Sequence, residues 1–287
     1  PLPTAAISGS TSVCPNSTAV ISFTGTPNAT ITYTVDSGAN QTITLDAAGN
    51  ATVTTPTLNT NSTYTLVSVR ASGTLACSQS QTGSATVIVV PLPTAAIAGT
   101  TTICSGSTTT ITFSGTPNAT VTYTVDSGAN QTITLDASGN ASVTTPALTS
   151  DSTYSLVSVA SAGTLSCSQL QTGSAIVSVI SLPTATISGS TTICSGGTAT
   201  ISFTGTPNAI VTYTVDSGAN QTVTLDATGN ATVTTSALTS DSVYTLVNVA
   251  LTGTASCSQA QTGSATITIA PLPTAAISGS TSVCPNS

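Results

Sequence analysis

Apolar and polar residues alternate along most of the chain with a period of two. Ile31, Tyr33 and Val35 alternate with threonines, and residues 42–45 and 51–54 show the same alternation. Successive side chains of a strand point to opposite faces, so this pattern predicts β-strands with one buried face. No stretch has the spacing of an amphipathic helix.

The first ninety residues predict about seven strands. Gly38 and Gly49 lie in the turns DSGAN and DAAGN, where a residue free to take positive φ joins two strands. Short alternating strands with frequent turns are typical of an immunoglobulin-like β-sandwich. The fold class predicted is therefore all-β. The strands are expected near residues 4–7, 19–25, 30–35, 40–45, 51–54, 64–69 and 85–90.

The whole pattern repeats with a period of 90 residues. PLPTAAI begins at Pro1, Pro91 and Pro271, and SLPTATI begins at Ser181. A fixed period of this kind is the signature of tandem domains. Residues 271–287 are identical to residues 1–17, which suggests a higher repeat of three domains in an array that continues both ways. The predicted domains are 1–90, 91–180 and 181–270, with 271–287 the truncated start of a fourth.

The joints between these domains contain proline. Pro93 and Pro183 restrict their own backbone and that of the preceding residue, which favours short, stiff connectors. The expected object is a linear rod of sandwich domains.

Charge excludes several classes of partner. Arg70 is the one cation, and the eight acids are all aspartates spread singly along the chain. Nucleic-acid binding and polybasic membrane attachment both need clustered cations, so neither is expected. Prolines interrupt the most apolar stretch, so no membrane insertion of this segment is expected.

Catalysis is not expected either. The chain has no His, Lys or Glu, so the usual nucleophile–base pairs cannot be built, and no cofactor is expected. Asp36 and Asp46 lie at opposite ends of one predicted strand, too far apart for glycosidase chemistry. Asp46 with Asn50, or Asp36 with Asn40, could instead contribute to a calcium site. Turn hydrogen bonds are the favoured interpretation, and no metal site is predicted.

Seven cysteines recur at regular places without histidine or a CxxC pair, which favours structural disulfides in an extracytoplasmic setting. One pairing joins cysteines within each domain, as in Cys14–Cys77. The other joins neighbouring domains, as in Cys14–Cys167, because the two cysteines of one sandwich are expected at opposite ends. The cysteines are Cys14, Cys77, Cys104, Cys167, Cys194, Cys257 and Cys284, the last needing a partner outside residues 1–287.

The string ISGSTTICSGGTATISFTGTPNAIVTYTVDSGANQTVTLDATGNATVTT, followed by a GTxxCSQxQTGSATVxV-like segment, carries a family resemblance. It resembles the Ig-like or PKD-like tandem repeats of giant surface proteins of Bacteroidota such as flavobacteria, over the whole chain. That resemblance implies type IX secretion, association with gliding motility, and an extracellular, cell-surface location. It also implies O-glycosylation at Ser152 and Ser242, each of which follows an aspartate; the first repeat has Asn61 at that place.

Two functions compete. The leading hypothesis is a structural segment of an extracellular fibre, stalk or filament, whose partners are further copies of the repeat in the same or neighbouring chains. The alternative is an adhesin that binds polysaccharide or surface glycans. Near-identical hairpins such as DSGANQT favour the first, because binding modules usually differ in their loops. Ice binding by Thr-x-Thr strands is a remote third hypothesis, since threonine favours strands in any case.

Overall fold

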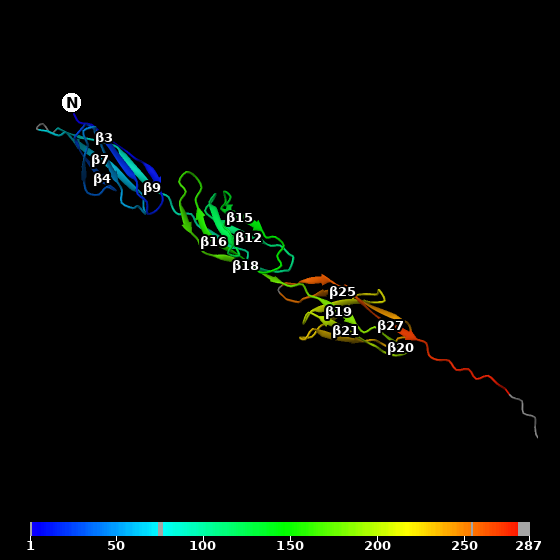
Figure 1. Ribbon diagram of the computed structural model, residues 1–287. Helices are drawn as coiled ribbons and strands as arrows, with labels where there is room; N and C mark the ends of the chain where they lie inside the picture. The colour runs from blue at the N-terminus through cyan, green and yellow to red at the C-terminus, as the bar shows by residue number, and fades with distance from the viewer. Residues whose placement is uncertain (1, 74–76, 254, 281–287) are drawn as a thin grey trace, which may run out of the picture. The chain divides into compact units, whose positions relative to one another are not determined.

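The computed structural model describes residues 2–73, 77–253 and 255–280, and these residues form an all-β protein (Figure 1). The predicted fold class is confirmed. None of the described residues forms a helix long and apolar enough to span a membrane.

In its described residues, 2–73 and 77–90, the first repeat has nine strands rather than about seven. They are β1 (Ala5–Ser8), β2 (Thr11–Val13), β3 (Val20–Gly25), β4 (Thr30–Val35), β5 (Gln41–Thr44), β6 (Asn50–Thr54), β7 (Ser62–Arg70), β8 (Ser78–Ser80) and β9 (Ser84–Val89). The two additional strands, β2 and β8, have three residues each, too few to produce a periodic pattern.

Equivalent strands recur about 90 residues apart. The second set is β10 (Ala95–Ala98), β11 (Thr101–Cys104), β12 (Thr110–Gly115), β13 (Thr120–Val125), β14 (Gln131–Thr134), β15 (Asn140–Thr144), β16 (Ser152–Ala160), β17 (Ser168–Leu170) and β18 (Ser174–Ile180). The third set is β19 (Ala185–Ser188), β20 (Thr191–Cys194), β21 (Thr200–Gly205), β22 (Ile210–Val215), β23 (Gln221–Thr224), β24 (Asn230–Thr234), β25 (Ser242–Ala250), β26 (Ser258–Ala260) and β27 (Ser264–Ala270).

The strands of the first repeat form two sheets. One has the order β1-β3-β6, and the other has the order β2-β9-β7-β4-β5 with β8 added beside β7. The third repeat has the same two sheets, β19-β21-β24 and β20-β27-β25-β22-β23 with β26 beside β25. Two mainly antiparallel sheets of this connectivity make an immunoglobulin-like β-sandwich.

Aromatic and branched side chains fill the space between the sheets. In the first repeat, Ile21 and Phe23 of β3 and Ile31 and Tyr33 of β4 are all buried. The rings of Phe23 and Tyr33 lie 5.0 Å apart between centroids. Burial of each such side chain stabilises the fold by about 1.5–3 kcal/mol, so the alternating pattern accounts directly for the core.

Gly9 carries the chain from the first sheet to the second. It separates β1 from β2 and has φ +113°, and a Cβ there would lie 2.5 Å from the carbonyl oxygen of Val20. Glycine adopts this conformation without steric cost. After the switch, β2 pairs in parallel with β9, with Val13 opposite Val89. Cys14 therefore follows at the end of the sandwich where β9 finishes.

The chain packs as two compact units. The first consists of Pro1–Gly99, Thr110–Val143 and Thr153–Ala175, and it holds the first sandwich together with strands of the second repeat. The second consists of Thr100–Thr109, Thr144–Ser152 and Ile176–Ser287, and it holds the third sandwich together with β11. The boundaries 1–90, 91–180, 181–270 and 271–287 remain a prediction from the sequence period, as does the linear rod.

Candidate functional site: the cysteine bridges

One cysteine of each repeat lies at the end of the strand that follows the sheet switch. Cys14 comes directly after β2, while Cys104 and Cys194 are the last residues of β11 and β20. The parallel pairing fixes their position, because Cys104 lies opposite Ile180 and Cys194 lies opposite Ala270. These cysteines are therefore held where the last strand of the repeat ends.

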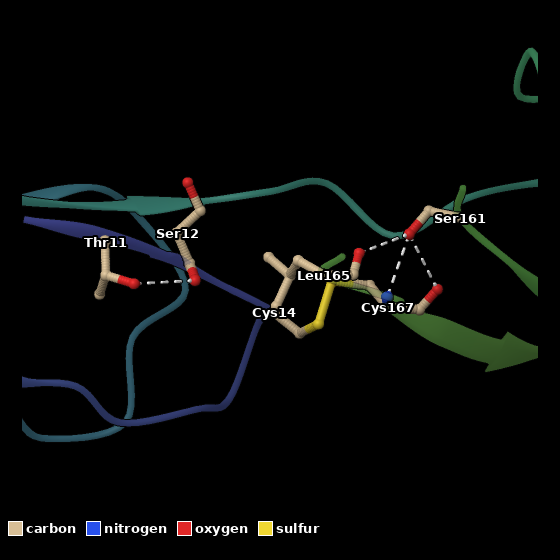
Figure 2. The surroundings of a disulfide bond; sticks show 6 residues. All are labelled: Thr11, Ser12, Cys14, Ser161, Leu165 and Cys167. Atoms are coloured by element: carbon tan, nitrogen blue, oxygen red, sulfur yellow. Dashed lines mark hydrogen bonds between the residues drawn. A yellow bond between two sulfur atoms is a disulfide. The ribbon is translucent and has the colours of Figure 1, made fainter. Parts of the chain in front are cut away.

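The other cysteine of each repeat lies in the loop before the short strand β8, β17 or β26. In the second repeat the Ser161 hydroxyl accepts a hydrogen bond from the Cys167 backbone N–H at 3.0 Å and lies 3.2 Å from the Leu165 carbonyl oxygen (Figure 2). The Ser161 N–H also donates to the Cys167 carbonyl at 2.8 Å. The loop therefore holds Cys167 through its backbone and leaves the sulfur free to bond elsewhere.

Two disulfides connect these two classes of cysteine. Cys14 bonds Cys167 (Figure 2), and Cys104 bonds Cys257, each with a Cα–Cα distance of 5.5 Å and a sequence separation of 153. Each bridge thus joins a cysteine of one repeat to a cysteine of the following repeat. Each also lies within one compact unit. Pairing within a repeat, the simpler of the two patterns considered from the sequence, is wrong for these four cysteines.

The geometry of β7 explains why pairing within a repeat fails. Cys14 lies beside the start of β7. It follows Val13, which pairs with Val89, and the Val89 N–H donates a hydrogen bond to the side chain of Asn61, the residue before β7. Cys77 lies at the other end, where its carbonyl accepts from Ala71 N–H, just past Arg70. The nine residues of β7 separate these ends by about 26 Å at ~3.3 Å per residue, whereas a bridge needs Cα atoms within about 7 Å.

The bonded and free cysteines differ in exposure. Cys167 is 1% exposed and Cys257 is 0% exposed, whereas Cys77, at the equivalent place in the first repeat, is exposed and carries a free thiol. Cys194 is also exposed and free. The prediction that it is bonded is therefore not met within the described residues, and the same holds for Cys77. Cys284 lies outside those residues.

The aspartates take structural roles. The Asp46 carboxylate accepts hydrogen bonds from Ala48 and Asn50 N–H at 2.9 and 2.8 Å, which confirms the turn interpretation there. Asp36 instead joins two segments, since it accepts from Thr63 N–H at 2.7 Å and from the Ser62 hydroxyl at 3.0 Å. Among the described residues, no three His, Cys, Asp or Glu side chains gather as a metal site.

Hydrogen bonds also perturb one of these carboxylates. Asp226 is the third-repeat equivalent of Asp46, and it accepts from Asn230 N–H, the Thr228 hydroxyl and Thr228 N–H. These donors hold the pKa of Asp226 below its ordinary value, because they stabilise the charged form. The perturbation has a local structural cause and does not indicate a catalytic acid.

The two serines predicted to carry glycans are buried. Ser152 and Ser242 are each 3% exposed, and the Ser242 hydroxyl donates to Asp216 at 3.0 Å. A sugar on that oxygen would displace the hydrogen bond and would need space that the sandwich already fills. Glycosylation at Ser152 and Ser242 stays a prediction, and their burial makes it unfavourable.

The residue before this serine position has a structural role in all three repeats. Asn61, Asp151 and Asp241 each accept a hydrogen bond through Oδ1 from a backbone N–H of the last strand, at 2.7–2.8 Å. Asn and Asp both present this oxygen, so either residue serves at the position. The Asp-Ser pair that suggested glycosylation is thus explained by strand pairing.

Surface aromatics suited to sugar stacking are scarce in the described residues. Tyr33 and Tyr64 are 4% and 3% exposed, and their equivalents in the other repeats are also buried. Burial raises the pKa of Tyr33 and is the largest cause of the raised pKa of Tyr64. These tyrosines belong to the core.

A shallow hollow of about 430 Å³ lies beside the free Cys194. It is lined by Ser195, Thr239, Ser240, Asp241, Ile269, Pro271 and Leu272. Leu272 is 60% exposed, whereas the equivalent joint residues Leu92 and Leu182 are half-buried.

Comparison with known proteins gives likenesses of fold only. No protein-family model matches the chain, and no curated protein matches it. A marsupial T cell receptor is similar with 10% identity and a TM-score of 0.42, over 85% of this chain and 96% of that one. The FN1–FN3 domains of chicken CNTN1 are similar with 12% identity and a TM-score of 0.29, over 86% of this chain and 93% of that one. A biofilm-associated protein BSP domain is similar with 14% identity and a TM-score of 0.26, over 94% of this chain and 67% of that one. At such values the likenesses carry no argument about function.

Proposed function

We propose that this chain is a structural repeat segment of an extracellular bacterial fibre, stalk or filament, without catalytic activity. The observation that carries the proposal is the pair of bridges Cys14–Cys167 and Cys104–Cys257, which run from repeat to repeat. A domain that only needs stability gains it from a bridge within its own fold. A bridge between successive domains serves the continuity of the array.

The bridges overlap along the sequence. Cys104 lies inside the loop that Cys14–Cys167 closes, and Cys167 lies inside the loop that Cys104–Cys257 closes. A pulling force therefore reaches Cys257 from Cys14 through sulfur as well as through the peptide joints. That arrangement suits a load-bearing thread.

The same bonds support an extracellular location. Disulfides persist in oxidising compartments and are rare in the cytosol. Cell-surface attachment, type IX secretion and an origin in Bacteroidota rest on the resemblance of the repeat sequence, and they form the finer part of the proposal.

The experiment that tests the proposal is electron microscopy of the native material, located with an antibody against this segment. Threads with an axial period of one repeat or of three repeats are the expected result. Isolated globules would contradict it. Reduction before imaging supplies the control, because threads whose continuity depends on the bridges should become more extensible without losing their sandwich domains.

An adhesin remains the second candidate, favoured by the abundance of exposed Thr and Ser side chains on the strands. Binding of the three-repeat chain to a glycan array would support it. Because Tyr33, Tyr64 and their equivalents are buried, any such binding is expected to be weak and to survive their conservative replacement by phenylalanine.

A further inference from the structure

The segment ANQT has no role in the contacts described so far. It is identical in the three repeats and places Asn40, Asn130 and Asn220 two residues before a threonine. Asn-X-Thr, with X other than proline, is the acceptor pattern for N-linked sugars on surface loops. The pattern is short and occurs elsewhere in this chain, so the structural surroundings decide which asparagines are accessible.

The asparagine of this segment is open to solvent. Asn40 lies directly before β5, and Asn40 and Thr42 are both exposed, as are their equivalents in the other repeats. Within residues 2–73, 77–253 and 255–280, no hydrogen bond engages the side-chain amide of Asn40, Asn130 or Asn220. An amide nitrogen without a competing partner is available to an enzyme that approaches from solvent.

The neighbouring strand holds the threonine of the pattern outward. Gln41 pairs with buried Tyr33 across β4 and β5, and the Tyr33 hydroxyl donates to Gln41 Oε1 at 3.0 Å. The same bond recurs at 3.0 and 3.1 Å in the other two repeats. Neighbouring side chains of a strand point to opposite faces, so Thr42 lies on the outer face of the sheet. The hydroxyl that the acceptor pattern requires is therefore presented to solvent.

The second asparagine class that carries the pattern in every repeat is used within a turn. Asn140 and Asn230 begin β15 and β24, and their side-chain nitrogens donate to the carbonyl oxygens of Ser138 and Thr228, each at 3.3 Å. The Asn230 nitrogen also donates to the Thr228 hydroxyl at 2.9 Å. These bonds explain the asparagines as turn residues.

The remaining Asn-X-Ser/Thr segments do not occur in every repeat. Asn28 has φ +56° in the turn before β4, and in the third repeat Ile210 stands where the pattern needs a hydroxyl. Asn16 and Asn61 start the pattern in the first repeat only. The Asn40 class is therefore the one that combines recurrence, exposure and an unengaged amide.

The same segment adjoins a sheet edge that lacks charge. β5, β14 and β23 are the last strands of the larger sheets, and no further strand among the described residues extends these sheets. Proteins commonly protect such edges from pairing with another molecule by placing charged residues, above all Lys, on them. At four residues these strands are short, which limits pairing, but QTIT, QTIT and QTVT contain neither charge nor proline. A bulky, hydrated sugar on the residue before the strand would supply the missing obstruction.

We propose that Asn40, Asn130 and Asn220 are N-glycosylation sites, and that their sugars keep β5, β14 and β23 from pairing with a second copy of the chain. The donor is a sugar joined through its C1 carbon to a phosphate group on a nucleotide or a lipid. The bond from Asn Nδ2 to C1 forms as the bond from C1 to the phosphate oxygen breaks. The phosphate leaves with the bonding electron pair, and the amide proton passes to a base of the transferase.

Mass spectrometry of the native material tests the sites. Peptic peptides are fragmented by electron transfer, which breaks the backbone and leaves a sugar on its residue. The expected result is a sugar on Asn40, Asn130 and Asn220 and none on Asn140 and Asn230. Unmodified asparagine at the first three positions, or equal occupancy of the last two, would overturn the proposal.

Variants made in the source cells test whether the pattern directs the modification. Combined replacement of Thr42, Thr132 and Thr222 by alanine removes the required hydroxyls and should lower the intact mass by three sugars beyond the change of residue. Replacement of the same threonines by serine keeps the hydroxyls and is the matched control, so its sugars should remain. Sugars that persist in the alanine variant would contradict the assignment.

Self-association tests the role of the sugars. A chain made in cells without the transferase should scatter more light than the glycosylated chain at equal concentration. Combined Thr42→Lys, Thr132→Lys and Thr222→Lys should reverse that increase without any sugar, because a charge then lies on each edge. An unglycosylated chain that stays monodisperse, or association that the lysines leave unchanged, would refute the protective role.

Cell fractions distinguish the two sources of the donor. The unglycosylated chain is incubated with UDP- and GDP-linked sugars and the soluble fraction of the source cells, or with their membranes alone. A gain of mass at Asn40 in the first arm identifies a nucleotide donor, and a gain in the second identifies a lipid donor. No gain in either arm would count against the proposal. None of these results bears on the bridges Cys14–Cys167 and Cys104–Cys257, so the proposed fibre function stands or fails separately.

Discussion

The overlapping bridges predict an unusual limit on how far the chain can be stretched. Between Cys14 and Cys257, four covalent routes run in parallel. They are Cys14–Cys167 followed by backbone to Cys257, backbone to Cys104 followed by Cys104–Cys257, both bridges joined by the backbone from Cys104 to Cys167, and the uninterrupted backbone. The shortest route becomes taut first. It is the third, which contains 63 residues of backbone by the difference of the two residue numbers.

The lengths follow from the extended backbone. At ~3.5 Å per residue, the oxidised chain cannot open beyond about 220 Å between Cys14 and Cys257, even when every domain is unfolded. The reduced chain has 243 residues between the same two points, by their residue numbers, and opens to about 850 Å. Removal of one bridge, by Cys14→Ser, leaves a shortest route of 90 residues, or about 315 Å.

The assay is single-molecule force spectroscopy with peptide tags as handles at the two ends of the chain, before and after reduction. Cys77→Ser is the matched control, because Cys77 is free and its loss should leave the oxidised length unchanged. Pairing within repeats would give the opposite result for that control. A longer oxidised chain in Cys77→Ser, or an oxidised length equal to the reduced length, would refute the bridge topology.

Other predictions concern the sandwich itself. Phe23→Ala removes a fully buried ring and should lower the free energy of unfolding of the first repeat by about 3–5 kcal/mol, as measured by chemical denaturation; a loss below about 1 kcal/mol would contradict the core assignment. Burial raises the pKa of Tyr33, so the folded state retains the phenolic proton more strongly, and stability should be full below the ordinary pKa of about 10 and fall as pH rises through it. Tyr33→Phe should reduce that alkaline loss in thermal melts, and an unchanged pH profile would count against it. Gly9→Ala should destabilise the fold more than Gly106→Ala. Both glycines have positive φ, but only at Gly9 would a Cβ meet backbone, 2.5 Å from the carbonyl oxygen of Val20. Equal shifts of the melting temperature would show that this contact relaxes freely.

The sequence predicted the sandwich because its signal is local and periodic. Ile31, Tyr33 and Val35 alternate with threonine, and Ile31 and Tyr33 face the core as expected. The strands β2 and β8 were missed because three residues rich in Ser and Thr carry no period. Gly9 is the signal that could have revealed β2, because a glycine inside an apparent first strand often marks a bend or a close backbone approach.

The disulfide pairing could be posed from the sequence but not decided. The argument that Cys14 and Cys77 lie at opposite ends of one sandwich holds, since β7 runs between them. The choice of partner depends on which loop of the next repeat comes near Cys14. Contact between domains leaves no mark on hydrophobic alternation, so a period-based argument cannot supply it.

The glycosylation of Ser152 and Ser242 stays a prediction, but the sequence already carries a signal that disfavours it. Ser152, Tyr154 and Leu156 occupy alternate positions of one strand, so Ser152 shares the buried face with the two apolar residues. A short Asp-Ser motif carries no information about that register. Strand alternation is the stronger evidence, because it fixes the direction of the side chain.

A disulfide map of the unreduced chain tests the central claim most directly. Trypsin is of little use because Arg70 is the one basic residue, so the digestion should use pepsin in acid, where few thiolates exist to exchange bonds. Mass spectrometry should then find peptides that join Cys14 to Cys167 and Cys104 to Cys257. A peptide that joins Cys14 to Cys77 would contradict the account, because it would close each repeat on itself and leave the array without its covalent staples.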